Sequence, residues 1–247
     1  MLRNQAPHSF QLIAGCALAL LAGLAQAAPQ PIRDLPLQAM GEQRWRLPAG
    51  EYAGQFRIDE SLQRFAPVME RARADGVRVR GYVSTVLGCP YQGEVPLADV
   101  VRVARALHDM GCYEVSLGDT IGVGTPARAA AMLRAVATEV PVPALALHFH
   151  DTYGQALANV LACLEQGARV IDAAVAGTGG CPYAHGASGN VASEDVVYML
   201  HGMGMQTGID LDALADTGRW LAGCLGRETG SRVGRATACA AAEPAVS

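Results

Sequence analysis

The sequence predicts an α/β protein of parallel strands covered by helices, arranged as an incomplete (β/α)8 barrel with about four strand–helix units. From about residue 58 onward, short strands alternate with amphipathic helices. Each strand is apolar almost throughout, which is typical of parallel strands buried on both faces. Polar residues follow the ends of successive strands, as on the rim of a barrel. The alternative is a doubly wound open sheet, which would bind its ligand at one switch point and not around a ring.

The first two units are indicated by hydrophobic periodicity. Leu62, Phe65 and Met69 share one stripe of a helix over 59–74, and an apolar strand follows at 77–87. Val100 and Leu107 lie on the buried face of a helix over 95–110, and the next strand is expected at 112–118.

The later elements are indicated by their helix-end residues. Thr125 as N-cap and Pro126 at the first helical position start a helix over 126–140, and a strand follows at 144–150. A helix over 152–166 ends at Gly167, before a strand at 170–176. Two further helices are expected at 193–203 and 210–225.

The flanking segments divide the chain into four parts. Residues 1–28 resemble a secretory signal peptide, with Arg3 before an apolar run and small residues at Ala25–Ala27. The alternative is an apolar segment upstream of a cytosolic domain. Residues 29–57 read as a linker or irregular structure, 58–236 as the barrel part, and 237–247 as a tail.

Composition excludes several function classes. The net charge of −4 does not suggest a nucleic-acid partner. All 19 basic residues are arginines, so no lysine can form a Schiff base or bind phosphate in a P-loop. The seven cysteines are odd in number and lack CxxC spacing, which does not indicate a disulfide framework or a structural zinc site.

Two histidines end the strand at 144–150. His148 and His150 are two residues apart, so both imidazoles point to one face of the strand and can meet at one metal ion. Cys181 and Asn190 follow in glycine-rich turns and could complete a site. The alternatives are that the histidines are hydrogen-bonded barrel residues, that Cys181 is a small buried hydrophobic residue, and that Asn190 serves a left-handed turn.

Five motifs resemble hydroxymethylglutaryl-CoA lyase over about 58–236. They are Gly81-Tyr-Val-Ser84 with Leu87-Gly-Cys-Pro-Tyr91, Ser116-Leu-Gly-Asp-Thr-Ile-Gly-Val-Gly-Thr125, His148-Phe-His-Asp-Thr-Tyr-Gly-Gln155, Val175-Ala-Gly-Thr-Gly-Gly-Cys-Pro-Tyr183 and Gly189-Asn-Val-Ala192. The resemblance implies a metal-dependent TIM barrel that cleaves 3-hydroxy-3-methylglutaryl-CoA to acetyl-CoA and acetoacetate, as in leucine catabolism and ketone body formation. It also implies an acyl-CoA substrate and a cytoplasmic location, with export as the alternative that the first segment suggests.

The resemblance assigns roles to particular residues. It implies that His148, His150 and Asn190 bind Mg²⁺ or Mn²⁺, and that Cys181 and His148 are catalytic. The mixed nitrogen and oxygen donors suit such an ion, which leaves the thiol for proton transfer. Four residues are expected to bind substrate: Tyr82, Ser116, Asp119 and Thr120. The alternative for Asp119 is that it caps the turn that follows it.

The chain departs from the family pattern in its first half. Family members begin with an Arg-Asp-Gly-Leu-Gln strand, whose aspartate binds the metal and whose arginine stabilises the enolate. Here Arg33 and Asp34 echo that motif with an extra residue and a proline, so a chance match and a real substrate-binding Arg33 with a metal-binding Asp34 both stay open.

Two hypotheses follow from this departure. The chain is either a lyase, active if it forms a homo-oligomer or if Arg33 and Asp34 reach the metal, or a truncated, non-catalytic remnant. A related acyl-CoA or pyruvate carboxyltransferase-type reaction is a third reading. Exposed strand edges in a partial barrel would favour self-association.

Overall fold

The computed structural model describes residues 11–14, 38–39, 45–46, 58–180 and 189–242. The chain divides into two compact units, one formed by Met1–Cys16 with Arg78–Ser247 and the other by Ala17–Val77. We describe each unit separately.

A parallel sheet forms the centre of the larger unit. Four of its strands are β4 (Arg80–Val83), β5 (Glu114–Asp119), β6 (Leu145–Phe149) and β7 (Val170–Ala173), and they pair in this order. All pairings are parallel, as the apolar strands predicted. The partial β/α barrel architecture expected from the sequence is therefore confirmed.

A fifth strand lies in the segment that resembles a signal peptide. β1 (Gln11–Ala14) pairs in parallel with β7, with Gln11 opposite Val170. Cleavage after Ala27 would remove this strand, so a cleaved signal and the five-stranded sheet exclude each other.

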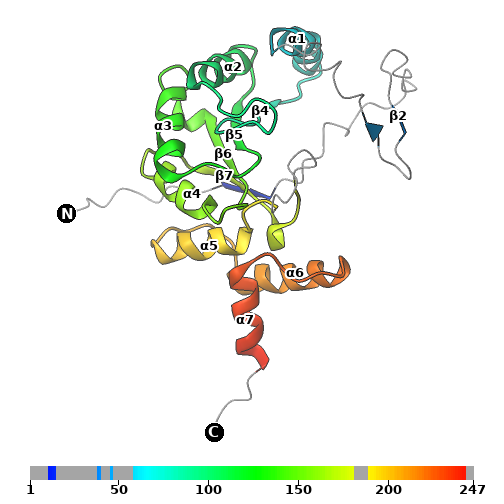
Figure 1. Ribbon diagram of the computed structural model, residues 1–247, viewed down its shortest axis with the longest axis vertical. Helices are drawn as coiled ribbons and strands as arrows, with labels where there is room; N and C mark the ends of the chain where they lie inside the picture. Colours follow the sequence, from blue (N-terminus) through cyan, green and yellow to red (C-terminus); the bar gives the residue numbers. More distant parts are fainter. Residues whose placement is uncertain (1–10, 15–37, 40–44, 47–57, 181–188, 243–247) are drawn as a thin grey trace, which may run out of the picture. The chain divides into compact units, whose positions relative to one another are not determined.

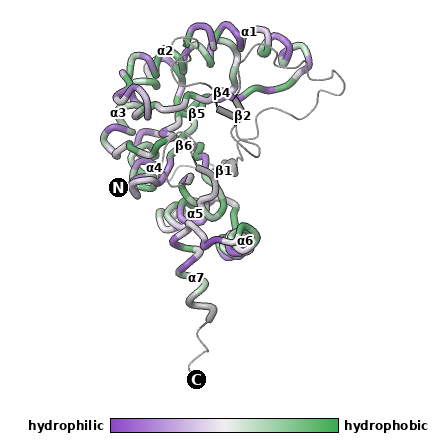
Figure 2. The backbone as a smooth tube through the Cα atoms, turned by 45° about the vertical axis from the view of Figure 1, so that its right-hand side comes forward, coloured by the Kyte–Doolittle hydropathy of each residue, from purple (hydrophilic) through white to green (hydrophobic). Residues whose placement is uncertain are grey.

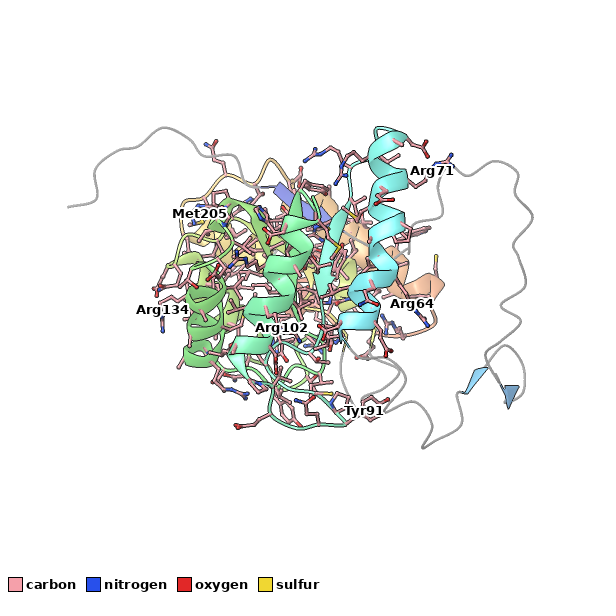
Figure 3. All side chains as sticks on the ribbon, turned by 90° about the horizontal axis from the view of Figure 1, so that it is seen from above. Arg64, Arg71, Tyr91, Arg102, Arg134 and Met205 are labelled. Carbon is pink, nitrogen blue, oxygen red and sulfur yellow. The ribbon has the colours of Figure 1, made fainter. Side chains whose placement is uncertain are left out.

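Three helices cover one side of the sheet (Figure 1). They are α2 (Leu97–Asp109), α3 (Pro126–Val136) and α4 (Ala156–Leu164). Leu117, Met132 and Phe149 are among the side chains that this packing buries. Figure 2 shows hydrophilic and hydrophobic residues along the same helices, and Figure 3 shows Arg134 on the outer side of α3, as expected for helices with one buried face.

The C-terminal part of the larger unit is helical. It consists of the 3-10 turn η2 (Val175–Gly177), α5 (Ser193–Gly202), α6 (Leu211–Cys224) and α7 (Arg232–Ala242). The sequence analysis did not predict α7 and assigned 237–247 to a tail, whereas the helix continues to Ala242. The N-terminus of α7 is fixed by Asp195, whose carboxylate accepts hydrogen bonds from the Arg232 and Val233 amides.

Several predicted elements are shorter than expected, and two of them have a clear local reason. The strand expected at 77–87 ends at Val83, since Thr85 adopts a positive φ of 59° that extended backbone excludes. The helix expected over 126–140 ends at Val136 and is followed by the 3-10 turn η1 (Val142–Ala144), which begins after Pro141.

The described residues of the smaller unit form one helix and one short strand pair. α1 (Ile58–Ala74) matches the first predicted helix, and β2 (Gln38–Ala39) pairs antiparallel with β3 (Trp45–Arg46) inside the expected linker. Among the described residues, no helix is long and apolar enough to cross a membrane.

Candidate active site

The two faces of the sheet differ in chemistry. Gly81 lies against Leu107 of α2, so the face that carries Gly81 is the one covered by helices. The strand alternation puts Tyr82 on the opposite face, and the β4–β5 register pairs it with Ser116. His148 and Asp172 are partners in the β6–β7 register and share that face. The sheet therefore presents polar side chains on the face away from α2, α3 and α4.

His148 and His150 lie together at the carboxyl end of β6. Their ring centroids are 5.3 Å apart and the rings are tilted by 49°, as expected for two side chains separated by two residues in an extended strand. His150 is buried and His148 is half-buried. The imidazoles are therefore close enough to contribute two ligands to one ion.

Asn190 is held beside this pair by the backbone. The Val191 amide donates to the Phe149 carbonyl at 3.1 Å, and the Ala174 amide donates to the Val191 carbonyl at 3.1 Å. These bonds fix the segment at the ends of β6 and β7, where the backbones of Asn190 and His150 form an isolated antiparallel β-bridge. The Asn190 amide group donates to the Thr178 carbonyl at 2.8 Å, while its buried Oδ1 accepts no hydrogen bond from the described residues.

These donors fit part of a divalent-ion site. Two imidazoles and an unpaired amide oxygen suit Mg²⁺ or Mn²⁺ better than a thiolate-rich set would. Within the described ranges, no group of three or more His, Cys, Asp or Glu side chains is placed to hold a metal. His148, His150 and Asn190 thus lie at the same strand end, and the carboxylate near them in the described part of the chain, Asp172 at 3.6 Å from His148 Nδ1, is paired with Arg80.

Three predicted site residues lie outside the described residues. They are Cys181, Asp34 and Arg33. Their roles stay predictions.

The four residues expected to bind substrate do not share one environment. Tyr82 is 57% exposed and Ser116 is buried, and both lie on the His148 face. Asp119 lies on the helix-covered face, fully buried, where its carboxylate accepts hydrogen bonds from the amides of Val123 at 3.2 Å and Gly124 at 2.7 Å. Burial raises the pKa of Asp119, although these amides and Arg128 oppose that shift. Thr120 follows it at the strand end, half-buried.

A buried ionic network that the sequence analysis missed joins the strands beneath the histidines. Arg80 donates to both carboxylate oxygens of Asp172, at 2.8 and 2.9 Å, and to Glu114 at 2.5 Å. Ser116 donates to Asp172 Oδ2 at 2.8 Å, and His148 Nδ1 lies 3.6 Å from the same oxygen. The spacing of these residues could have indicated the network, because Arg80 and Glu114 lie two residues before Tyr82 and Ser116 and therefore on the same face of the sheet.

The network favours the ionised forms of Arg80 and Asp172. Burial disfavours the Asp172 carboxylate, but the nearby His148 and the hydrogen bonds from Arg80 and Ser116 hold its pKa below the usual range. Burial also disfavours the Arg80 guanidinium, but Asp172 and Glu114 raise its pKa. Arg80 and Asp172 therefore form an ion pair close to the candidate metal ligand His148.

A second buried carboxylate fixes the backbone after β7. Glu194 is fully buried in α5, and both its oxygens accept from the Ala176 amide, at 2.9 and 3.1 Å. Ala176 has a positive φ of 56°, which is rare for a residue with a side chain. Thr85 after β4 also has positive φ, so strained backbone follows two strands at the rim where a ligand would bind.

Comparison with known proteins gives this arrangement a family. The HMGL-like family model matches residues 51–221. The chain is 60% identical over 179 residues to a protein from Gallus gallus named "Hydroxymethylglutaryl-CoA lyase, mitochondrial". The aligned residues make up 72% of this chain and 60% of that relative. The chain thus spans less than two thirds of the length of that relative.

Solved structures agree with the sequence match. A hydroxymethylglutaryl-CoA lyase from Pseudomonas aeruginosa superimposes with a TM-score of 0.74 at 56% identity, over 76% of this chain and 63% of that one. An HMG-CoA lyase from Acenitobacter baumannii, in complex with coenzyme A and 3-methylmalate, gives 0.69 at 38% identity, over 72% of this chain and 58% of that one. The motifs that suggested the resemblance therefore lie in a shared fold, and the chain belongs to the HMGL-like family of carbon–carbon lyases with a TIM-barrel architecture.

Proposed function

We propose that this chain is a divalent-metal-dependent lyase that cleaves 3-hydroxy-3-methylglutaryl-CoA to acetyl-CoA and acetoacetate. The observation that carries this proposal is the position of His148 and His150 at the carboxyl end of β6, next to Asn190, whose Oδ1 accepts no hydrogen bond from the described residues. Active sites of β/α barrels lie at this end of the strands. The relative crystallised with coenzyme A and 3-methylmalate supports an acyl-CoA substrate.

The metal would be held by His148, His150 and Asn190, with Asp34 as a further candidate ligand. A bound Mg²⁺ or Mn²⁺ ion supplies Lewis acidity for the substrate oxygens. Arg33, Tyr82, Ser116 and Thr120 are proposed to bind substrate, with Asp119 acting from the opposite face of the sheet through the loop that it holds. Tyr82 has the side chain most accessible to such a ligand, since it is exposed on the polar face.

The proposed reaction is a retro-Claisen cleavage. The tertiary hydroxyl of the substrate loses its proton, the carbon–carbon bond breaks, and its electron pair moves into the thioester as an enolate while the hydroxyl carbon becomes the ketone of acetoacetate. We propose that the Cys181 thiol donates a proton to the enolate carbon, which yields acetyl-CoA, and that the proton taken from the hydroxyl restores the thiol. His148 counts as catalytic because its imidazole would face the reacting oxygens.

The test is acetoacetate formation by the purified chain with added Mg²⁺ or Mn²⁺. We expect slow, metal-dependent cleavage, because no carboxylate joins the three donors in the described residues. Cys181→Ala should lower it by about 10²–10⁴-fold. The matched control is Cys89→Ala, since Cys89 lies in a second Gly-Cys-Pro-Tyr motif and should leave the rate unchanged. An equal rate in wild type and Cys181→Ala would overturn the proposal.

A second candidate function is binding of a metal or acyl-CoA without catalysis. The hydrogen bonds of the two nearby carboxylates favour it. Asp172 is paired with Arg80 and Asp119 with loop amides, so neither carboxylate is available to bind the ion. Mn²⁺ binding without cleavage would support this function over the lyase.

Self-association and location are also proposals. In the described residues β5 is the neighbour of β4, and no strand covers the other edge of β4, so we propose a homo-oligomer that protects this edge. Light scattering should then give a mass above the 25.7 kDa of one chain. We propose a cytoplasmic location; the relative from Gallus gallus is named mitochondrial, and the comparisons do not support export.

A further inference from the structure

We propose that Asp172 is a positioning residue that orients the His148 imidazole toward the metal, with Arg80 and Ser116 holding its carboxylate in place. This inference rests on the proposed metal site and names a residue that acts on that site through a ligand.

Strand pairing brings the two side chains together. His148 and Asp172 face each other across the β6–β7 register, and His148 Nδ1 lies 3.6 Å from Asp172 Oδ2. An imidazole whose Nδ1 faces a carboxylate carries its proton on that nitrogen and leaves the lone pair of Nε2 for a metal. The carboxylate thus selects both the tautomer and the ring orientation.

Asp172 is itself fixed. Its side chain is about 7% exposed, and the Arg80 guanidinium donates to its two oxygens in parallel bonds of 2.8 and 2.9 Å. Ser116 donates to Oδ2 at 2.8 Å, the oxygen nearest His148. A planar two-bond pairing of this kind restricts rotation of the carboxylate. The imidazole therefore contacts a rigid group and not a freely rotating side chain.

Glu114 offers a comparison that distinguishes a positioning role of Asp172 from a purely structural one. It also binds Arg80, at 2.5 Å, and its side chain is about as buried as that of Asp172, at 8%. The two carboxylates thus have similar places in the ionic network, but the one close to His148 is Asp172. If the network only stabilised the sheet, loss of either charge would have the same effect on metal binding.

The experiment compares Asp172→Asn with Glu114→Gln as the matched control. Mn²⁺ binding is measured by electron paramagnetic resonance and calorimetry, and the His148 tautomer by ¹⁵N NMR of the metal-free chain. Asp172→Asn should weaken Mn²⁺ binding by about 10–100-fold and reduce the Nδ1-protonated form of His148. Glu114→Gln should change neither. Ser116→Ala is the variant to use if Asp172→Asn does not fold, and it should weaken Mn²⁺ binding where Glu114→Gln does not.

Equal Mn²⁺ affinities in Asp172→Asn and wild type, or equal losses in both carboxylate variants, would overturn the inference. Failure of the wild-type chain to bind Mn²⁺ would instead refute the metal site of the proposed function. In that case the NMR comparison still decides the role of Asp172, because an unchanged His148 tautomer in Asp172→Asn contradicts it without any metal.

Discussion

Gly218 on α6 provides a sharp test of the packing around Glu194. A Cβ built at Gly218 overlaps with Glu194 Oε1, whereas a Cβ built at Gly223 on the same helix meets nothing within 4 Å. The two glycines therefore offer the same substitution, glycine to alanine in one helix, with opposite surroundings.

The expected magnitudes follow from these surroundings. Gly223→Ala should stabilise the chain by up to about 1 kcal/mol through helix propensity. Gly218→Ala gains the same term, but it must displace a fully buried carboxylate and break its bonds to the Ala176 amide. Overpacking costs about 1–3 kcal/mol, and leaving a buried polar group unpaired costs a similar amount. We expect a net loss of about 3 kcal/mol once the helix gain is included.

Urea unfolding followed by circular dichroism measures both changes. With a slope of about 2 kcal/mol/M, Gly218→Ala should lower the midpoint by about 1.5 M while Gly223→Ala raises it slightly. A Gly218→Ala chain as stable as the wild type would show that Glu194 is not confined between η2 and α6, and the reasoning about this contact would be wrong.

Three further predictions concern charges and a helix cap. Arg80→Gln leaves two buried carboxylates without their partner and should destabilise the chain by about 3–5 kcal/mol in urea unfolding, whereas Arg71→Gln in an exposed pair should leave the urea midpoint nearly unchanged. Asp210→Ala removes the side chain that accepts from the first amides of α6 and should lower stability by about 1 kcal/mol in the same assay. Burial raises the pKa of Glu194, so the native state binds more protons than the unfolded state and stability falls as pH rises from the ordinary glutamate pKa through the raised one. In that window Glu194→Gln should show a flatter dependence of the urea midpoint on pH, and parallel curves for the two chains would contradict the assigned shift.

Much of the fold could be predicted from periodicity and helix-end signals. Helices α1 to α6 and strands β4 to β7 lie in the ranges where amphipathic and apolar stretches predicted them. α7 was missed because its sequence, Arg-Val-Gly-Arg-Ala-Thr-Ala-Cys-Ala-Ala-Ala, has Val233 as its one large apolar residue and a glycine near its start. Its start depends on Asp195, 37 residues earlier in the chain, and such a long-range cap cannot be detected within a local window.

The candidate site was predictable to the extent that it is local. His148 and His150 are two residues apart in one strand, so their shared direction follows from strand geometry. Asn190 is different, because the backbone bonds of its neighbour Val191 to Phe149 and Ala174 bring it there, and the motif resemblance was needed to identify it. The turn-capping alternative for Asp119 was also available, and the structure shows its carboxylate bonded to the Val123 and Gly124 amides.

The Arg80–Asp172 pair depends on the shape of the sheet. The two residues are 92 positions apart, and β5 and β6 lie between their strands. In a flat sheet three strand spacings of about 4.8 Å and a register offset of four residues would separate the two backbones by about 19 Å, well beyond the reach of an arginine that contacts an aspartate. Bonds of 2.8 and 2.9 Å therefore require the sheet to curl toward its polar face, as the strands of a barrel do. The same curvature brings the charged network beneath His148, so the geometry of the candidate metal site and the barrel-like closure of the sheet have one physical origin.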